Sequence, residues 1–148
     1  MKLDDLILKI GREVASTSSL DIIEEAEEII HPITLEPYMP FKRDFKHFKI
    51  NELFYILCSM EQGKTIEEIA EFVMRCPSLL KHYIFFSIPI EHSSKLVCVK
   101  LKNIMSVESP IKTLYDTFEL GFFVNEEEML KDYYQRVYRF SKEIIMIR

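Results

Sequence analysis

The hydrophobic periodicity changes from helical to alternating near residue 83, and that change constrains the fold more than any other feature. Apolar residues recur at helical spacing through most of residues 3–83. Residues 83–90 and 96–104 are instead rich in β-branched and aromatic side chains, with the polar residues 91–95 between them. Such a pattern is typical of two strands joined by a loop. We therefore predict a mainly α-helical fold of six to seven helices with one β-hairpin.

Capping signals place several helix boundaries. Two capping boxes are formed by Thr65 with Glu68 and by Asn125 with Glu128. They predict helices over residues 66–75 and from Asn125 to about residue 147. A helix over residues 51–62 is expected before the first of these, capped by Asn51 and ended by Gly63.

Length and composition favour one compact intracellular domain spanning residues 1–148, with helical flanks at 1–50 and 105–148. The chain is 48% apolar and contains only three glycines and six prolines, which argues against disorder. The net charge of −5 argues against wholesale attraction to nucleic acid or to an anionic membrane. No apolar run approaches the length of a membrane span. The three cysteines show no C-x-x-C spacing and are expected to be buried thiols in a reducing compartment.

Residues 40–50, PFKRDFKHFKI, combine three aromatic rings with several cations. A helix starting at Pro40 would place Phe41, Phe45 and Phe48 on one stripe, because their spacing is i, i+4, i+7. The cations would then lie on the remaining surface, whereas a platform for nucleic acid presents rings and cations together. The pattern therefore favours a helix that faces the core and has a basic outer side.

Three predicted helices over residues 51–62, 66–75 and 78–83, followed by a hairpin over 84–104, resemble a winged-helix module in element order. The resemblance implies that the third helix contacts DNA bases, but the only polar side chains that this helix offers for base recognition are Lys81 and His82. It leaves nucleic-acid binding as the alternative function. The cations that would contact phosphates are Lys42, Arg43, Lys46, Lys49, Lys81, Lys95, Lys100 and Lys102.

The last helix is apolar over more than one face. Leu130, Tyr134 and Val137 are expected near one face, and Tyr133 falls toward another. Such width indicates either deep burial or a second surface that a partner covers, and the pattern leaves both open. Because tyrosine and arginine are enriched at protein interfaces, we predict a partner-binding surface. Its residues are Tyr133, Arg136, Tyr138 and Arg139.

No catalytic, metal-binding or cofactor-binding residues are predicted. His92 and Ser93 are adjacent, but neighbours in an extended chain point to opposite sides, and no phosphate-binding or nucleophile motif is present. The E-x-x-H of residues 28–31 lacks the second motif that a di-iron bundle requires. The sequence therefore favours a non-catalytic interaction or adaptor subunit that binds a protein partner or a second copy of itself.

Overall fold

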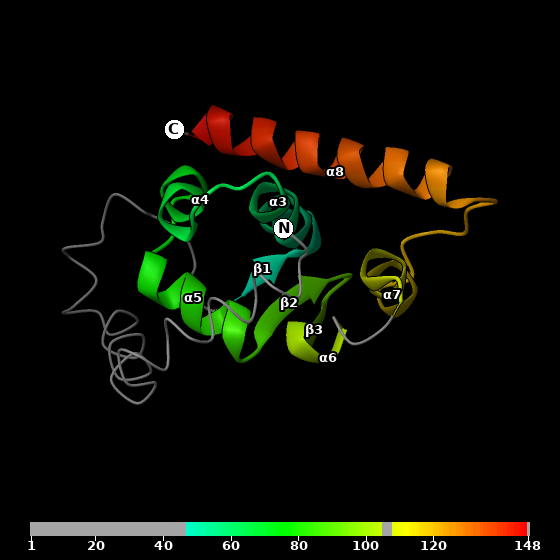
Figure 1. Cartoon of the computed structure of the whole chain (residues 1–148), viewed down its shortest axis with the longest axis horizontal. Helices are drawn as coiled ribbons and strands as arrows, with labels where there is room; N and C mark the ends of the chain where they lie inside the picture. The colour runs from blue at the N-terminus through cyan, green and yellow to red at the C-terminus, as the bar shows by residue number, and fades with distance from the viewer. Residues whose placement is uncertain (1–46, 105–107, 148) are drawn as a thin grey trace.

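A computed structural model describes residues 47–104 and 108–147 of the chain, and all statements on structure concern these residues (Figure 1). They contain six helices, which account for 64% of them, and one three-stranded sheet. The mainly α-helical fold with a hairpin in its middle part is therefore confirmed.

The elements follow one another along the chain with short connections. In order they are β1 (Phe48–Lys49), α3 (Ile50–Glu61), α4 (Ile66–Val73), α5 (Pro77–Phe85), β2 (Ile88–His92), β3 (Lys95–Val99), α6 (Leu101–Ile104), α7 (Pro110–Thr117) and α8 (Glu126–Ile147).

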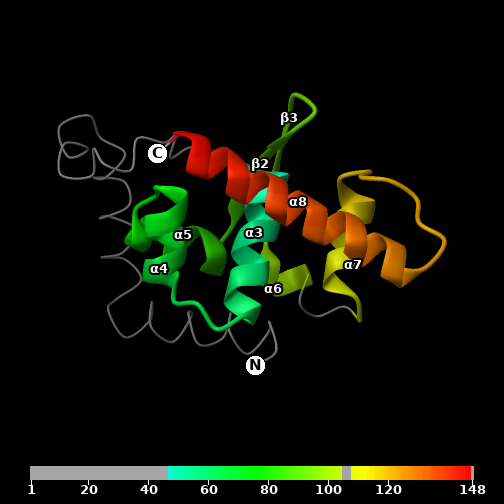
Figure 2. The same cartoon turned by 90° about the horizontal axis from the view of Figure 1, so that it is seen from above.

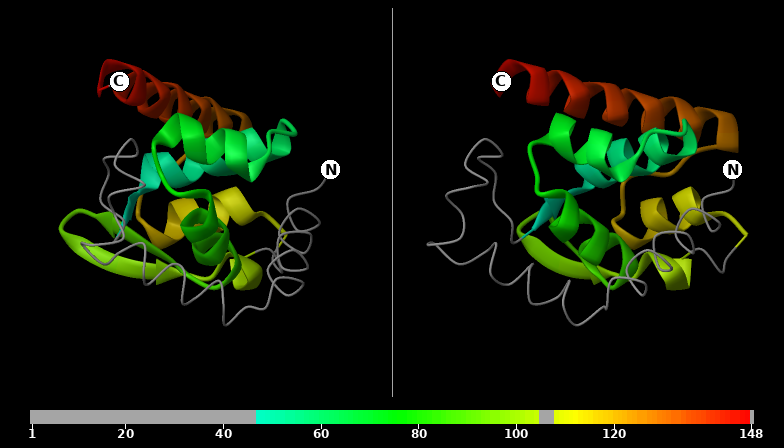
Figure 3. Two further views of the ribbon diagram at one scale, coloured as in Figure 1. Left: turned by 90° about the vertical axis from the view of Figure 1, so that its left-hand side faces the viewer. Right: turned by 60° about the vertical axis from the view of Figure 1, so that its left-hand side comes forward.

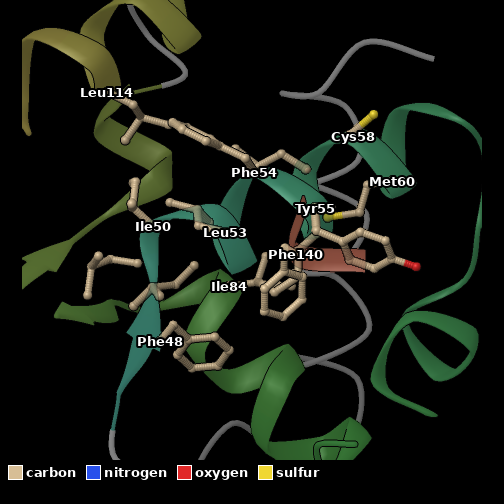
Figure 4. Close-up of a cluster of buried hydrophobic side chains, with 14 of the residues drawn as sticks. Phe48, Ile50, Leu53, Phe54, Tyr55, Cys58, Met60, Ile84, Leu114 and Phe140 are labelled. Atoms are coloured by element: carbon tan, nitrogen blue, oxygen red, sulfur yellow. The ribbon is translucent and has the colours of Figure 1, made fainter. Parts of the chain in front are cut away.

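Helix α3 forms the centre of the core. Every residue from Glu52 to Met60 is buried, which is the pattern of a helix enclosed on all sides. Helix α8 packs along α3 on the side away from the sheet (Figures 1 and 2). Figure 4 shows Phe54 of α3 directed toward Leu114 of α7, and Tyr55 near Phe140 of α8.

The hairpin is tighter than the sequence predicts. Strands β2 and β3 pair in antiparallel register from Ile88 with Val99 to His92 with Lys95. Only Ser93 and Ser94 form the turn, with φ values of 51° and 63°, and a two-residue loop with positive φ at both positions is the type I′ arrangement. The predicted loop over 91–95 is therefore too long. The predicted strand over 96–104 is also too long, because residues 101–104 form α6.

Residues 48 and 49 form a strand rather than the end of the predicted helix. Strand β1 pairs in parallel with β2, with Phe48 opposite Ile90. Phe48 is buried and Lys49 is exposed, so the ring and the cation are separated by strand alternation and not by helical phase. The other aromatic and basic residues of this stretch, Phe41, Lys42, Arg43, Phe45 and Lys46, lie outside the described residues.

Most of the predicted helix caps are confirmed. The Thr65 hydroxyl accepts from the Glu68 N–H at 3.1 Å, and a Glu68 carboxylate oxygen accepts from the Thr65 N–H in return. Gly63 ends α3 with a φ of 86°, and the Asn125 side chain accepts from the Glu128 N–H at 2.9 Å. The predicted cap at Asn51 is wrong, since α3 begins one residue earlier and its N-cap is Lys49.

A buried ion pair connects the two helices α3 and α4 with β1. Glu52 and Arg75 are 0% and 2% exposed, and the Arg75 guanidinium donates to both carboxylate oxygens at 2.6 and 3.0 Å. It also donates to the His47 carbonyl at 2.8 Å, and its central carbon lies 3.9 Å from the centroid of the Phe48 ring. Arg75 lies two residues after the end of α4, so its side chain ties this end of α4 to residues 47–52, which are 23 or more residues away in sequence.

The sheet has an arrangement that the sequence did not indicate. The order of three helices followed by a hairpin is present, but β1 precedes the first of those helices and lies in parallel beside β2, giving the strand order β1-β2-β3. The described residues therefore form a mostly helical fold with one small sheet.

Candidate protein-interaction site

The four predicted partner-binding residues all lie on α8, a 22-residue helix on the outside of the molecule. Figure 3 shows the same placement from two further directions: α8 covers α3, and no other described element lies over its far side. One face of α8 therefore packs inward and the opposite face is open. The two faces are described in turn.

The inner face is formed by Met129, Tyr133, Phe140 and Ile144, which are buried. Tyr133 is 1% exposed, its ring contacts Phe54 edge to face, and its hydroxyl donates to the Phe54 carbonyl at 3.3 Å. Burial is the main reason that the pKa of Tyr133 is raised. Tyr133 is thus a core residue and offers no surface to a partner.

Arg136 is largely used within the molecule. Its guanidinium donates to Asp132 at 2.8 Å and to the Asn51 side chain at 3.2 Å, and the Tyr115 hydroxyl donates to the same Asp132 oxygen. Burial acts to raise the pKa of Asp132, but the hydrogen bonds from Arg136 and Tyr115 and the nearby positive charge outweigh it, so the pKa is lowered. Arg136 therefore holds α8 against α3 and α7.

The outer face carries an exposed apolar stripe. Tyr134, Tyr138 and Ile145 are 54%, 60% and 59% exposed. With Ser141 they follow spacings of four, three and four residues, the repeat that aligns side chains on one seam of a helix. We call these four residues the outer stripe. Tyr134 shares a side of α8 with Leu130 and Val137, as their spacing predicts, but those two are half-buried and Tyr134 is exposed.

One basic side chain borders the outer stripe: the Lys142 ammonium lies 4.8 Å from the centroid of the Tyr138 ring. Arg139 is also exposed, but it lies more than a quarter of a turn round the helix from Tyr138. Tyrosine, which supplies two of the exposed side chains here, is among the residues enriched as interface anchors. Chemically, the face can pack an apolar helix side and hydrogen-bond through two tyrosine hydroxyls.

The residues of the alternative nucleic-acid surface are divided among several elements. Lys81 of α5 is mostly buried and pairs with Glu67 at 2.7 Å, and Lys49 of β1 lies 3.9 Å from Glu143. Three lysines are exposed near the hairpin: Lys95 belongs to β3, Lys100 directly follows β3, and Lys102 belongs to α6. Lys42, Arg43 and Lys46 fall outside the described residues.

His92, Ser93 and the three cysteines are spread over the hairpin, α3 and the residue before α5. Ser93 lies in the hairpin turn, and the His92 ring contacts Phe118 edge to face. Cys58 and Cys76 are buried as expected, but Cys98 is exposed, because it points to the solvent side of an edge strand. Among residues 47–104 and 108–147, no three histidine, cysteine or acidic side chains lie close enough to hold a metal ion.

None of the described helices combines the length and the apolar character that crossing a bilayer requires. Comparisons with protein-family models, with curated proteins and with solved structures found no match.

Sequence reasoning found Tyr138 and Arg139 on the outer face but missed Tyr134 and Ile145. The four-three-four spacing of residues 134, 138, 141 and 145 could have identified Tyr134 and Ile145. It marks a second stripe on α8, about a third of a turn or more from the stripe that contains Phe140 and Ile144. Which of the two stripes faces the core could not be read from the sequence, since both contain tyrosine and isoleucine.

Proposed function

We propose that this protein is a non-catalytic interaction subunit that binds a protein partner through the outer stripe of α8. The observation that carries the proposal is the exposure of Tyr134, Tyr138 and Ile145 on a side of α8 about a third of a turn from its packed face. Scattered apolar residues are normal on a protein surface, but an apolar row along a rigid helix has the geometry of a helix-docking surface.

The partner is expected to present an amphipathic helix. Its apolar side would cover Tyr138 and Ile145, and acidic side chains along its edge would meet Arg139 and Lys142. A second copy of this chain would serve the same purpose if two α8 helices paired side by side. The outer stripe could therefore bind either a different protein or a second copy of this chain. One experiment can distinguish these two kinds of partner.

The test uses the tagged chain to capture proteins from its native host, together with light scattering of the purified chain over a range of concentrations. Tyr134→Ala and Tyr138→Ala should each weaken a genuine complex by about 30-fold, as the loss of an interface anchor does. Gln135→Ala, an exposed change on the same helix but off the stripe, is the matched control. Equal capture by all variants, with no concentration-dependent mass, would contradict the proposal.

The alternative is a winged-helix-like protein that contacts nucleic acid through its hairpin. It is supported by the order of α3, α4, α5 and the hairpin, and by the exposure of Lys95, Lys100 and Lys102. Such a protein should bind duplex DNA with an affinity that falls steeply with salt, and Lys100→Glu with Lys102→Glu should abolish that binding. Absence of binding at low salt would eliminate this alternative.

A further inference from the structure

The loop between α7 and α8 exposes large apolar side chains to an unusual degree. Phe122 and Val124 are 95% and 83% exposed, whereas Phe123 between them packs edge to face on Tyr115 with ring centroids 5.7 Å apart. Just before these residues, Gly121 has a φ of 137°, a conformation in which other residues are strained. With Phe123 anchored inward, its two neighbours are directed into solvent.

A pocket of 540 Å³ lies beside these two side chains, between α7, the loop and the first turns of α8. Its inner wall includes the buried Tyr115 and Met129 together with Phe123, and Lys112, Asp116 and Glu126 lie at its exposed edge. The volume falls within the range of sites that enclose a ligand or an anchoring side chain. Phe122 and Val124 border the same pocket, so apolar surface is available both inside it and next to it.

The charged side chains that line the pocket are Asp116, Glu126 and Lys112, and the segments that form it are acidic along their length. Residues 108–131 carry six acidic and two basic side chains, all exposed, a net charge of −4. One of the two cations, Lys131, lies 3.9 Å from Glu127 and is partly neutralised by it. Three of the acids, Glu126, Glu127 and Glu128, form the first turn of α8. An anionic membrane, nucleic acid or an acidic peptide would therefore be repelled from this edge.

We propose that the pocket and the Phe122–Val124 loop form a docking site for a basic amphipathic segment of a partner protein. An apolar side chain of that segment enters the pocket against Tyr115 and Met129, and Phe122 and Val124 cover its apolar flank. Lysine or arginine residues of the segment pair with Asp116 and the acidic first turn of α8. This site is distinct from the outer stripe of α8, so the protein would have two separate docking surfaces.

The experiment measures fluorescence anisotropy of two labelled helical peptides with the same leucine and phenylalanine pattern, one with lysine and one with glutamate at its polar positions. The full chain should bind the lysine peptide and not the glutamate peptide. Raising the salt from about 0.01 M to about 0.15 M shortens the screening length from about 30 Å to about 8 Å and should weaken binding. Hydrogen exchange should slow in α7 and in the first turns of α8 when the lysine peptide is present.

Variants distinguish docking at this site from non-specific attraction to an acidic protein. Phe122→Ser should weaken binding by about 30-fold, and it should leave the fold intact because the ring is exposed. Replacing Glu126 and Glu127 by lysine should weaken binding of the lysine peptide further and reduce the salt dependence of that binding. Leu96→Ser, an exposed apolar change on β3, and Tyr138→Ala on the outer stripe should each have no effect.

The proposal is overturned if Phe122→Ser binds the lysine peptide as tightly as the unchanged chain, or if the glutamate peptide binds equally well. It is also overturned if exchange slows only at the outer stripe, or if light scattering shows a dimer that Phe122→Ser dissociates, since the occupant would then be a second copy. Because Tyr138→Ala is tested in parallel, loss of the outer-stripe complex and loss of this site are separate outcomes.

Discussion

Removing one member of the buried Glu52–Arg75 pair should destabilise the protein strongly. Arg75→Met removes the guanidinium that pairs with the Glu52 carboxylate, which is 0% exposed, and it removes the hydrogen bond that this guanidinium donates to the His47 carbonyl. Breaking a buried pair in this way costs about 3–5 kcal/mol of unfolding free energy. A domain has about 5–15 kcal/mol in total, so the loss would be a third or more of the stability of many domains.

The double variant Glu52→Leu with Arg75→Met should be much less destabilised than the sum of the two single variants. Both charges are then absent, and apolar side chains of similar size occupy a site that already contacts the Phe48 ring. Replacing a buried pair by apolar residues is often close to neutral. The lost hydrogen bond to the His47 carbonyl accounts for about 1 kcal/mol, so we expect a coupling energy of about 3 kcal/mol or more.

The measurement is urea unfolding followed by circular dichroism. With a slope of about 2 kcal/mol per molar urea, a loss of 4 kcal/mol lowers the midpoint by about 2 M. Lys131→Met is the control, since it breaks the exposed pair with Glu127 and should change stability by about 0.5 kcal/mol or less. A cost below about 1 kcal/mol for Arg75→Met, or additive effects in the double variant, would refute the view that the pair is enclosed and coupled.

Three further changes test local features by the same unfolding assay. Thr65→Ala removes the capping box of α4 and should cost about 1 kcal/mol, whereas Thr65→Ser should be nearly neutral; equal effects would exclude the side-chain cap. Asp132→Asn should lower stability by about 1 kcal/mol at pH 7. Because the folded pKa of Asp132 is lowered, this deficit should persist above about pH 4 and vanish as the pH falls through the folded pKa; a constant deficit would show that the charge is not involved. Replacing Ser93-Ser94 by Asn-Gly should raise stability by about 0.5–1 kcal/mol, because both positions have positive φ; a loss would show that the serine side chains support the turn.

The helices were predictable wherever short-range signals agree with one another. Thr65 with Glu68, Asn125 with Glu128, and Gly63 each act within a single turn of backbone, so neighbouring residues contain the required information. The change of period near residue 83 likewise predicted the hairpin. Its exact turn was missed because positive φ at two serines is not favoured by residue type and is imposed by strand pairing.

The candidate site was only partly predictable for a related reason. Tyr133 and Tyr134 are adjacent and chemically identical, yet one is buried against Phe54 and the other is half exposed. The choice between them depends on which side of α8 meets α3, and that is a property of packing between segments about 80 residues apart. The fully exposed Phe122 was missed for the same reason, because its orientation follows from the burial of Phe123 on Tyr115.

By itself, the sequence determined the helical class, several helix ends and the presence of one hairpin, since these depend on hydrogen bonds and dihedral preferences within a few residues. Only the tertiary structure decided that Phe48 lies in a parallel strand, that Glu52 meets Arg75 across 23 residues, and which face of α8 is open. These outcomes depend on burial of surfaces brought together from distant segments, and no local pattern of residues encodes which surfaces will meet.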